Sequence, residues 1–207
     1  MNFEKLSFEQ LVLALASDAP TPGGGTAAAL AGAMGASLVE MVAALTVAKE
    51  KYAASHGVVR PIGEAAARAR ERLLRLAEED SSSYDAVVTA RRLPKETDGE
   101  RDERSRRIAE ANRLAAEVPM RTAREASGVL TFLPELAEKG NPNAASDAGA
   151  AALLLEASVQ AALLNVGINL SGMKDEFAAR MTEEADRLGH EAGRLRERTL
   201  ATVRAKI

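Results

Sequence analysis

The sequence predicts an all-α fold, a single-domain bundle of long helices, and three observations support this. Apolar residues recur at helical spacing through long segments, capping signals stand where such segments begin, and alternating β-branched runs bounded by hairpin turns are absent. With 207 residues, 46% of them apolar, the chain can bury a sizeable core and is within the range of one domain. We therefore expect residues 1–207 to form one helical domain.

Helix boundaries follow from local start and stop signals. Two pairs have capping-box spacing, Ser7 with Gln10 and Thr97 with Glu100, so a helix should begin after each first residue. Proline disfavours helical geometry in the preceding residue, so Leu93-Pro94-Lys95 should end a helix, and a proline inside a helical pattern should kink or divide it. The expected helices cover about residues 8–17, 24–52, 61–92, 98–139 with a kink or boundary at Pro119, 144–170 and 174–204.

Two turns should separate long helices. One is expected at His56-Gly57, and the other is Gly140-Asn141-Pro142-Asn143, whose last residue can cap the helix that follows. The last helix should pack as an ordinary amphipathic helix, because its apolar residues lie near one face. These residues are Phe177, Met181, Ala185, Leu188, Ala192, Leu195 and Val203.

Composition excludes several classes of function. A net charge of −3 from 27 basic and 30 acidic residues gives no electrostatic footprint for nucleic acid, and 3% aromatics leaves little on which bases could stack. The absence of cysteine removes disulfides, thiolate nucleophiles and zinc-thiolate sites, and fits a reducing compartment. His56 and His190 have no spacing that pairs them on a metal or supports a Ser/His/Asp triad, so we expect no metal site.

Two apolar stretches, Gly24–Ala48 and Ala148–Leu170, approach the length of a membrane span. The first carries Glu40 near its middle, and a charge at a bilayer centre costs roughly 2.5–3.5 kcal/mol. The second carries four polar residues, so we expect both to be core helices. Residues 1–5 lack the features of a signal peptide and should belong to the fold. The absence of cysteine, which fits a reducing compartment, favours a cytoplasmic protein.

The loop Pro22-Gly23-Gly24-Gly25, at the mouth of a helix, is the clearest signal of a ligand site. Its N–H groups are unscreened by side chains and the helix dipole adds partial positive charge, so it could bind an anion or a carbonyl oxygen. The loop lacks the Lys-Ser/Thr ending of a phosphate-binding loop, and no strand precedes it. The glycines could equally serve a tight turn or close helix packing, and the small stripe Ala28, Gly32, Gly35 does not discriminate.

Asp80 falls on the apolar face of its predicted helix, with Leu76, Tyr84 and Val87. Burial would raise the pKa of this carboxyl and suit it to proton transfer, whereas a basic partner would leave it ionised. The alternative is a carboxylate satisfied by donors of a neighbouring helix or partly exposed. Asp85 lies on another side of the helix.

A polar stripe of Asp147, Ser158, Asn165 and Asn169 shares one side of an otherwise apolar helix. Asp147 lies in the first turn, where the helix dipole favours its charged form, so it could simply cap the helix. At a rise of about 1.5 Å per residue, Asp147 and Asn165 are about 27 Å apart. They should therefore contact opposite ends of a long ligand, or different ligands.

Lysines near the end of the second predicted helix raise a similar question. Lys49 would lie about 35 Å from Thr26 if their helix is continuous. It can share a site with the glycine loop only across a subunit interface or through a helix break. A solvated helix-end lysine is the alternative for both Lys49 and Lys51.

Short segments along nearly the whole chain together carry a family resemblance. They are residues 19–25, 32–36, 40–42, 49–52, 80 with 84–87, 93–95, 118–120, 140–143 with 145–149, and 164–166 with 168–170. In their order and coverage the sequence resembles the folate cyclodeaminase/methenyltetrahydrofolate cyclohydrolase family. That family is all-helical and usually dimeric, and it occurs alone or as the C-terminal half of formiminotransferase-cyclodeaminase.

The resemblance implies a tetrahydrofolate substrate, whose one-carbon bridge between two nitrogens is opened by water or closed with loss of ammonia. Both reactions pass through a tetrahedral carbon and need proton transfer, and the resemblance implies no cofactor beyond the tetrahydrofolate substrate and no metal. The chain has no formiminotransferase half, which favours the cyclohydrolase. A formimidoyltetrahydrofolate cyclodeaminase and a non-catalytic folate-binding helical protein are the alternatives.

The resemblance also suggests roles for individual residues. Asp80 and Asp147 are the candidates for proton transfer, and a homodimer could share the cleft between subunits. The expected substrate-binding residues are Pro22, Gly23, Gly24, Gly25, Asn143, Ser146, Asn165 and Asn169, with Lys49, Lys51 and Lys95 for the ligand's carboxylates. Two departures stand out: Ala48 and Glu50 thin the family's lysine-rich stretch, and Thr26 replaces a smaller residue, which should matter little.

Overall fold

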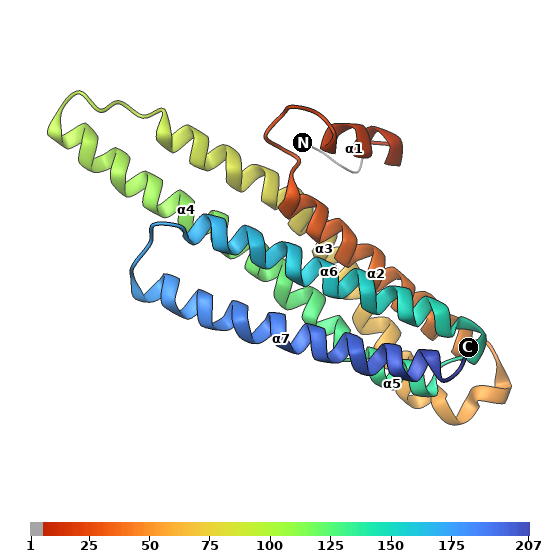
Figure 1. Cartoon of the computed structure of the whole chain (residues 1–207). Helices are drawn as coiled ribbons and strands as arrows, with labels where there is room; N and C mark the ends of the chain where they lie inside the picture. The colour runs from red at the N-terminus through yellow and green to blue at the C-terminus, as the bar shows by residue number, and fades with distance from the viewer. Residues whose placement is uncertain (1–5) are drawn as a thin grey trace.

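A computed structural model describes residues 6–207, which form seven α-helices and two short 3₁₀ helices (Figure 1). No strand occurs among these residues, so the all-α prediction is confirmed. The expectation for residues 1–5 lies outside the described part. The helices are α1 (Phe8–Leu15), α2 (Gly24–Val47), η2 (Glu50–Tyr52), α3 (Ala53–Arg91), α4 (Asp98–Leu130), α5 (Leu133–Lys139), η3 (Pro142–Ala144), α6 (Ala145–Leu170) and α7 (Glu176–Arg204).

The long helices pack side by side along one axis, with α2 against α3 and α6, and α4 against α3 and α6 (Figure 1). Helices α2 and α6 approach closely because α2 presents small residues. A Cβ on Gly32 would lie 2.6 Å from Ser158 Oγ, and the Ser158 hydroxyl donates a 2.7 Å hydrogen bond to the Ala28 carbonyl. The small-residue stripe therefore serves close helix packing, which was one of the two interpretations from the sequence. Leu73, Leu76, Met120, Leu133 and Leu155 fill the core around it.

Both predicted capping boxes are present. Ser7 Oγ accepts from the Gln10 backbone at 3.2 Å, and Thr97 Oγ1 accepts from the Glu100 backbone at 3.2 Å, with the reciprocal bonds also made. Helix α1 nevertheless buries none of its residues and lies beside the bundle rather than in it (Figure 1). It leads directly into the glycine loop at the start of α2.

The turn predicted at His56-Gly57 is wrong, because both residues lie within α3. The chain instead breaks at Lys49, whose extended backbone separates α2 from η2. Helix α3 continues through Pro61, which is exposed and close to the helix start, while Val59 and its neighbours bury against the core.

Two further boundaries differ from expectation. Helix α4 runs through Pro119, which is buried among core residues on both sides, so of the two alternatives expected there the boundary is excluded and the kink stays a prediction. Asn143 does not cap α6, whose N-cap is Ala144 with no side-chain hydrogen bond. The Asn141 side chain occupies the turn instead and accepts from the Asn143 backbone at 3.1 Å.

Helices α2 and α6 are also the two helices long and apolar enough to cross a membrane. In the structure they are inner helices of the bundle, with half of the α2 window and 39% of the α6 window buried. This agrees with the expectation of core helices. Their outer faces, however, keep large apolar side chains exposed, namely Met34, Met41, Leu45, Leu153, Leu164 and Ile168.

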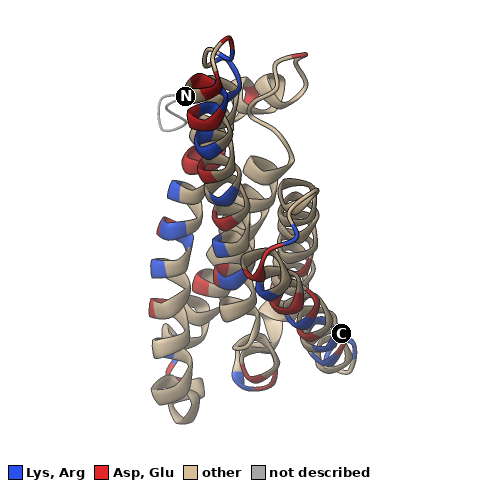
Figure 2. Cartoon of the chain, turned by 90° about the vertical axis from the view of Figure 1, so that its left-hand side faces the viewer, with Lys and Arg blue, Asp and Glu red and all other residues tan. Residues whose placement is uncertain are grey.

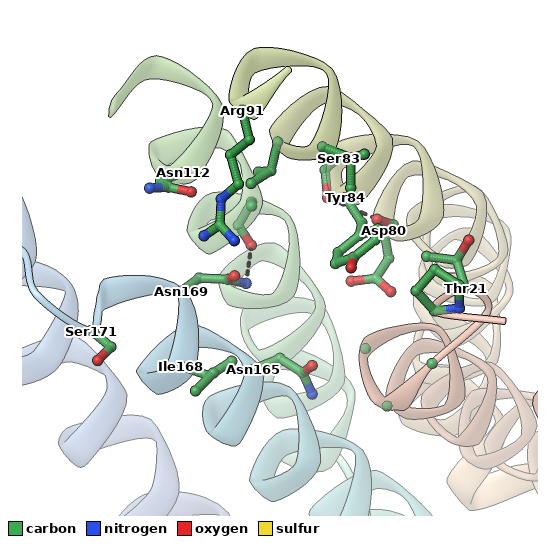
Figure 3. Close-up of a pocket in the computed structure, with 17 residues that line it drawn as sticks. Thr21, Asp80, Ser83, Tyr84, Arg91, Asn112, Asn165, Ile168, Asn169 and Ser171 are labelled. Atoms are coloured by element: carbon green, nitrogen blue, oxygen red, sulfur yellow. Dashed lines mark hydrogen bonds between the residues drawn. The ribbon is translucent and has the colours of Figure 1, made fainter. Parts of the chain in front are cut away.

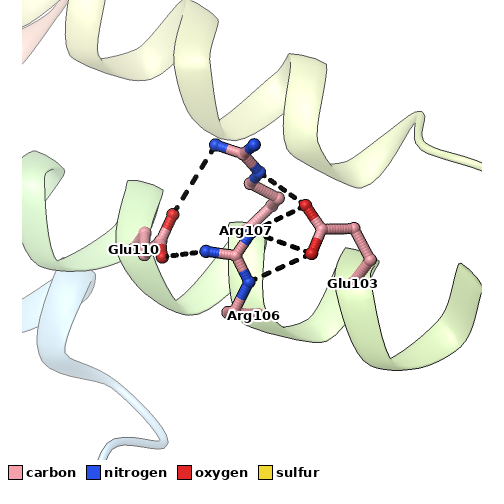
Figure 4. Close-up of polar contacts among 4 residues, drawn as sticks. All are labelled: Glu103, Arg106, Arg107 and Glu110. Carbon is pink, nitrogen blue, oxygen red and sulfur yellow. Dashed lines mark hydrogen bonds and ion pairs between the residues drawn. The ribbon is translucent and has the colours of Figure 1, made fainter. Parts of the chain in front are cut away.

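Both basic and acidic residues occur along the other helices (Figure 2). On α4, Arg106 and Arg107 bridge Glu103 and Glu110 at i,i+3 and i,i+4 spacing (Figure 4). Hydrogen bonds from Arg106 and Arg107 lower the pKa of Glu103. This exposed network supports the first turns of α4, which pair with the end of α3 beyond the main core (Figure 1).

Candidate functional site

A cavity of about 540 Å³ opens where the glycine loop meets the ends of α3 and α6 and the middle of α4 (Figure 3). Helix α3 lines it with both polar and apolar side chains, and α6 contributes two amides. The lining residues are Pro20, Thr21, Gly23, Gly24, Gly25, Asp80, Ser83, Tyr84, Val87, Val88, Arg91, Asn112, Ala115, Asn165, Ile168, Asn169 and Ser171.

Asp80 is the acidic residue of this cavity, and its half-buried carboxylate lies against the first turn of α2. Thr26 donates a 3.0 Å hydrogen bond from its hydroxyl to Asp80 Oδ2. Within residues 6–207 the carboxylate has no ion-pair partner. Burial raises the pKa of Asp80 above its ordinary value, and hydrogen bonds from the Thr26 side chain and backbone offset part of that rise.

Gly25 allows the Asp80 carboxylate to lie where it does. A Cβ at Gly25 would come 2.2 Å from Asp80 Oδ1 and 2.6 Å from its Cγ, far closer than real side-chain contacts. The glycine at this position is therefore required by the close approach of a neighbouring carboxylate, which settles the purpose of one of the three glycines. The carboxylate also lies at the N-terminus of α2, where Gly23 offers no side-chain cap and the Thr26 backbone helps to lower the pKa of Asp80.

The opposite wall carries three amide side chains, Asn112, Asn165 and Asn169 (Figure 3). Asn169 donates to the Ala115 carbonyl of α4 at 2.7 Å, and Asn165 donates to the Ala161 carbonyl of its own helix at 2.8 Å. Both side chains are thereby oriented, and their carbonyl oxygens stay open to a donor. The cavity thus places the Asp80 carboxylate across from amide side chains that can form hydrogen bonds with a ring containing several nitrogens.

The structure brings together one part of the predicted site. Pro22 lies buried beneath the loop, after a cis peptide bond with Thr21. Of the predicted residues, those lining the cavity are Gly23, Gly24, Gly25, Asp80, Asn165 and Asn169.

A second part of the predicted site lies at the opposite end of the bundle. Five predicted residues do not line the cavity, namely Lys49, Lys51, Asn143, Ser146 and Asp147. The cavity lies at the start of α2 and the end of α6, whereas these residues lie near the end of α2 and the start of α6. At this far end the buried side chain of Asn141 connects the turn before α6 to η2 and to the end of α2. It accepts from the Tyr52 hydroxyl at 3.1 Å and donates to the Leu45 carbonyl at 3.3 Å.

Lys95 lies in neither group. It follows the end of α3 in the loop before α4, where it is exposed and does not line the cavity. Among residues 6–207 no cluster of three potential metal-ligating side chains occurs. His190 is exposed, whereas His56 is half-buried, with Nε2 3.2 Å from the Lys49 carbonyl oxygen.

Sequence reasoning missed four polar lining residues, Ser83, Arg91, Asn112 and Ser171. A signal for Arg91 existed, since it follows Asp80 and Tyr84 at i+11 and i+7 and so shares their helix face. Asn112 could not have been found in this way. It lies among the charged residues of α4, where one more polar side chain carries no signal.

Comparisons with known proteins identify the family of the chain. The family model of formiminotransferase-cyclodeaminase matches residues 7–187. The chain belongs to this family. The resemblance read from the sequence is thereby confirmed.

Relatives of this formiminotransferase-cyclodeaminase family member include both single-domain and longer proteins. The chain is 42% identical to methenyltetrahydrofolate cyclohydrolase of Methylorubrum extorquens, over 97% of each protein. It is 34% identical to formimidoyltransferase-cyclodeaminase of Rattus norvegicus over 82% of its own length, but spans only 31% of that protein. The solved structure of formiminotetrahydrofolate cyclodeaminase from Thermotoga maritima superposes with a TM-score of 0.87 at 34% identity, covering 99% and 98% of the two chains.

Thr26, which was expected to matter little, donates its hydroxyl to the Asp80 carboxylate in this member of the formiminotransferase-cyclodeaminase family. If Asp80 is the base expected from the sequence, Thr26→Val should move the acidic limb of the pH–rate profile to higher pH, because loss of the hydroxyl donor raises the pKa of Asp80 further and a base must be ionised. Loss of this buried hydrogen bond should also cost about 1 kcal/mol of folding free energy. The measurement is kcat/KM against pH, with chemical unfolding.

Two further variants make this test specific. Thr26→Ser keeps the hydroxyl and should restore the wild-type limb. Thr199→Val removes an equally buried hydroxyl that bonds only within α7, and it should leave the limb in place. An unshifted limb in Thr26→Val would show that Thr26 does not tune Asp80.

Proposed function

We propose that the protein is a methenyltetrahydrofolate cyclohydrolase, which converts 5,10-methenyltetrahydrofolate and water to 10-formyltetrahydrofolate. One observation carries the proposal: the Asp80 carboxylate faces the cavity with no basic partner among the described residues. The methenyl bridge of the substrate carries positive charge. A half-buried carboxylate that lacks a cation suits such a ligand, because the ligand supplies the missing charge.

The chemistry needs one nucleophile and one group that moves protons. Asp80 takes a proton from a water molecule while the water oxygen bonds to the methenyl carbon. The product of this step is neutral and has a tetrahedral carbon between the two nitrogens. The bond from this carbon to N5 then breaks as N5 gains a proton and the new hydroxyl loses one, leaving a formyl group on N10. One proton is released overall. The amides of Asn165 and Asn169 lie on the opposite wall, where they can orient the ring.

The relatives favour the cyclohydrolase over its alternatives. The Methylorubrum extorquens protein matches the chain along almost the whole length of both, whereas the chain covers about a third of the longer formimidoyltransferase-cyclodeaminases. The Thermotoga maritima structure makes the cyclodeaminase the second candidate. Nucleophilic addition and proton transfer suffice for either reaction, so the proposal includes no cofactor beyond the tetrahydrofolate, and it assigns the reaction to the cytoplasm.

Assay of the purified protein with both substrates tests the function. A cyclohydrolase should remove the absorbance of added 5,10-methenyltetrahydrofolate faster than buffer does. A cyclodeaminase should generate that absorbance from 5-formiminotetrahydrofolate and release ammonia. Binding of tetrahydrofolate without turnover of either substrate would instead indicate a non-catalytic binding protein.

We also propose that the protein is a homodimer in which the outer faces of α2 and α6 pair. The exposed apolar side chains on these faces include Leu164 and Ile168, 76% and 71% exposed, and such a contiguous face on two neighbouring helices favours a partner. Ile168 also lines the cavity, so the face reaches the site. A two-fold axis across α2 and α6 would bring the partner's end that carries Lys49, Lys51 and Asp147 to this cavity.

Mixing two inactive variants tests the shared site. If Asp147 serves the partner's cavity, Asp80→Asn and Asp147→Asn proteins should each lose activity and regain it when unfolded and refolded together, because a mixed dimer contains one intact site. Sedimentation should give twice the chain's mass of 21.8 kDa. A monomer, or an active Asp147→Asn protein, would contradict the shared site.

A further inference from the structure

Arg91 provides the positive charge of the cavity wall. It is the only cationic residue among the lining residues, and no carboxylate within residues 6–207 pairs with it. Many other arginines of the chain lie in ion pairs, for example Arg72 with Glu125 and Arg124 with Glu184. Figure 3 shows the Arg91 guanidinium extended toward Asn169 across the open space. A guanidinium placed in this way can bind a carboxylate by donating two parallel N–H hydrogen bonds to its oxygens.

The backbone that carries Arg91 is fixed. Arg104 of α4 donates two hydrogen bonds to the Arg91 carbonyl, at 3.1 and 3.2 Å from Nη2 and Nε. These bonds satisfy a carbonyl in the last turn of α3 and tie α3 to α4. The Arg91 side chain therefore starts from a defined point at the mouth of the cavity.

Asp80 and Arg91 mark two ends of one face of α3. Eleven residues separate them, which places their Cα atoms about 16 Å apart along the helix. Tyr84, Val87 and Val88 lie between them and line the same cavity. Ser83 lines it too, but its hydroxyl donates to the Asp80 backbone carbonyl at 2.8 Å, so the rest of the wall between the two charges is aromatic and apolar. The order along this wall is thus carboxylate, apolar floor, guanidinium.

This order matches the chemistry of a folate. Its pteridine carries the one-carbon bridge, a benzoyl ring follows, and the glutamate carboxylates come last. We propose that Arg91 binds a glutamate carboxylate of the substrate, with the benzoyl ring over Tyr84, Val87 and Val88 and the one-carbon bridge at Asp80. The proposal rests on the proposed function for the position of the one-carbon bridge. Within one chain, Arg91 takes the role of binding the glutamate carboxylate that the sequence analysis gave to Lys49, Lys51 and Lys95, since none of these lysines lines the cavity.

Two substrates that differ only in the glutamate test this assignment. Arg91→Gln should raise KM for 5,10-methenyltetrahydrofolate about tenfold or more, because a charge-assisted hydrogen bond is lost, and it should leave kcat nearly unchanged. The variant should behave as wild type with 5,10-methenyltetrahydropteroate, which lacks glutamate. Arg91→Lys should show a smaller rise in KM. Arg92→Gln, which removes the adjacent exposed guanidinium outside the cavity, should match wild type with both substrates.

Other outcomes separate failure of this proposal from failure of the proposed function. An equal rise in KM for both substrates, or no rise for either, would overturn the role of Arg91 while the enzyme remains a cyclohydrolase. If wild-type protein turns over neither substrate, equilibrium binding of tetrahydrofolate and tetrahydropteroate makes the same comparison without turnover. The assignment then stands if Arg91→Gln weakens only the binding of tetrahydrofolate, and it fails if wild type binds both equally or binds neither.

Discussion

Asparagine in place of Asp80 is expected to lower kcat by about 10²- to 10⁴-fold, the usual contribution of a positioned acid or base. The fold should survive this change. Asparagine has nearly the same shape, caps a helix N-terminus as well as aspartate does, and can still accept the hydrogen bond from Thr26. Stopped-flow decay of the methenyl absorbance gives the rate, and urea unfolding gives the stability.

A matched control lies on the same helix. Asp85→Asn makes the same chemical change five residues later, at an exposed position that does not line the cavity, and it should keep wild-type kcat. Turnover by Asp80→Asn within a few-fold of wild type would show that Asp80 has only a structural role at the N-terminus of α2. The alternative given for Asp80 from the sequence, a carboxylate satisfied by donors of a neighbouring helix, would then be the correct one.

The parts of the fold that the sequence predicted well depend on local chemistry. Capping boxes at Ser7 and Thr97 and the stop before Pro94 act within a few residues, so their positions could be read directly. The turn at His56-Gly57 failed for the opposite reason. Glycine and proline weaken a helix locally, but burial of neighbouring residues against α2 keeps α3 continuous, and this depends on tertiary packing.

The same distinction between local sequence pattern and tertiary packing separates the site residues that could be predicted from those that could not. Asp80 could be found because a carboxylate on an apolar face is an anomaly that the pattern itself displays. The separation of Asn165 from Asp147 also followed from the rise of a helix alone, and the structure places them at opposite ends of α6. Arg91 and Asn112 stand where polar residues are ordinary. Their role appears only when α3, α4 and α6 are brought together around one cavity.

The glycine loop shows how packing and chemistry can require the same residue. On sequence alone its glycines had two competing explanations, close packing or ligand contact. Gly25 combines them, since the group that packs against its Cα is the Asp80 carboxylate, the proposed base. A change at Gly25 should therefore affect catalysis through the position of that carboxylate and leave its charge in place.

Gly25→Ala is expected to lower kcat about 100-fold or more, since a displacement of about 1 Å at a reacting group has an effect of that size. The new Cβ would lie 2.2 Å from Asp80 Oδ1, so the carboxylate must swing away and give up its hydrogen bond from Thr26. Stability should fall by about 1–3 kcal/mol, as for other overpacked sites. Kinetic assays and urea unfolding of the purified variant measure both effects.

Gly128→Ala separates this effect from the general consequences of a glycine-to-alanine change. Gly128 lies in α4 with open space around the position of a Cβ, so the added methyl should raise helix stability and leave kcat unchanged. If Gly25→Ala kept wild-type kcat, the Asp80 carboxylate would tolerate displacement and could not be the group that meets the one-carbon bridge. If it lost kcat as Asp80→Asn does, the position of the carboxylate would matter as much as its charge. That is the result expected of a base held in place by a glycine and a threonine.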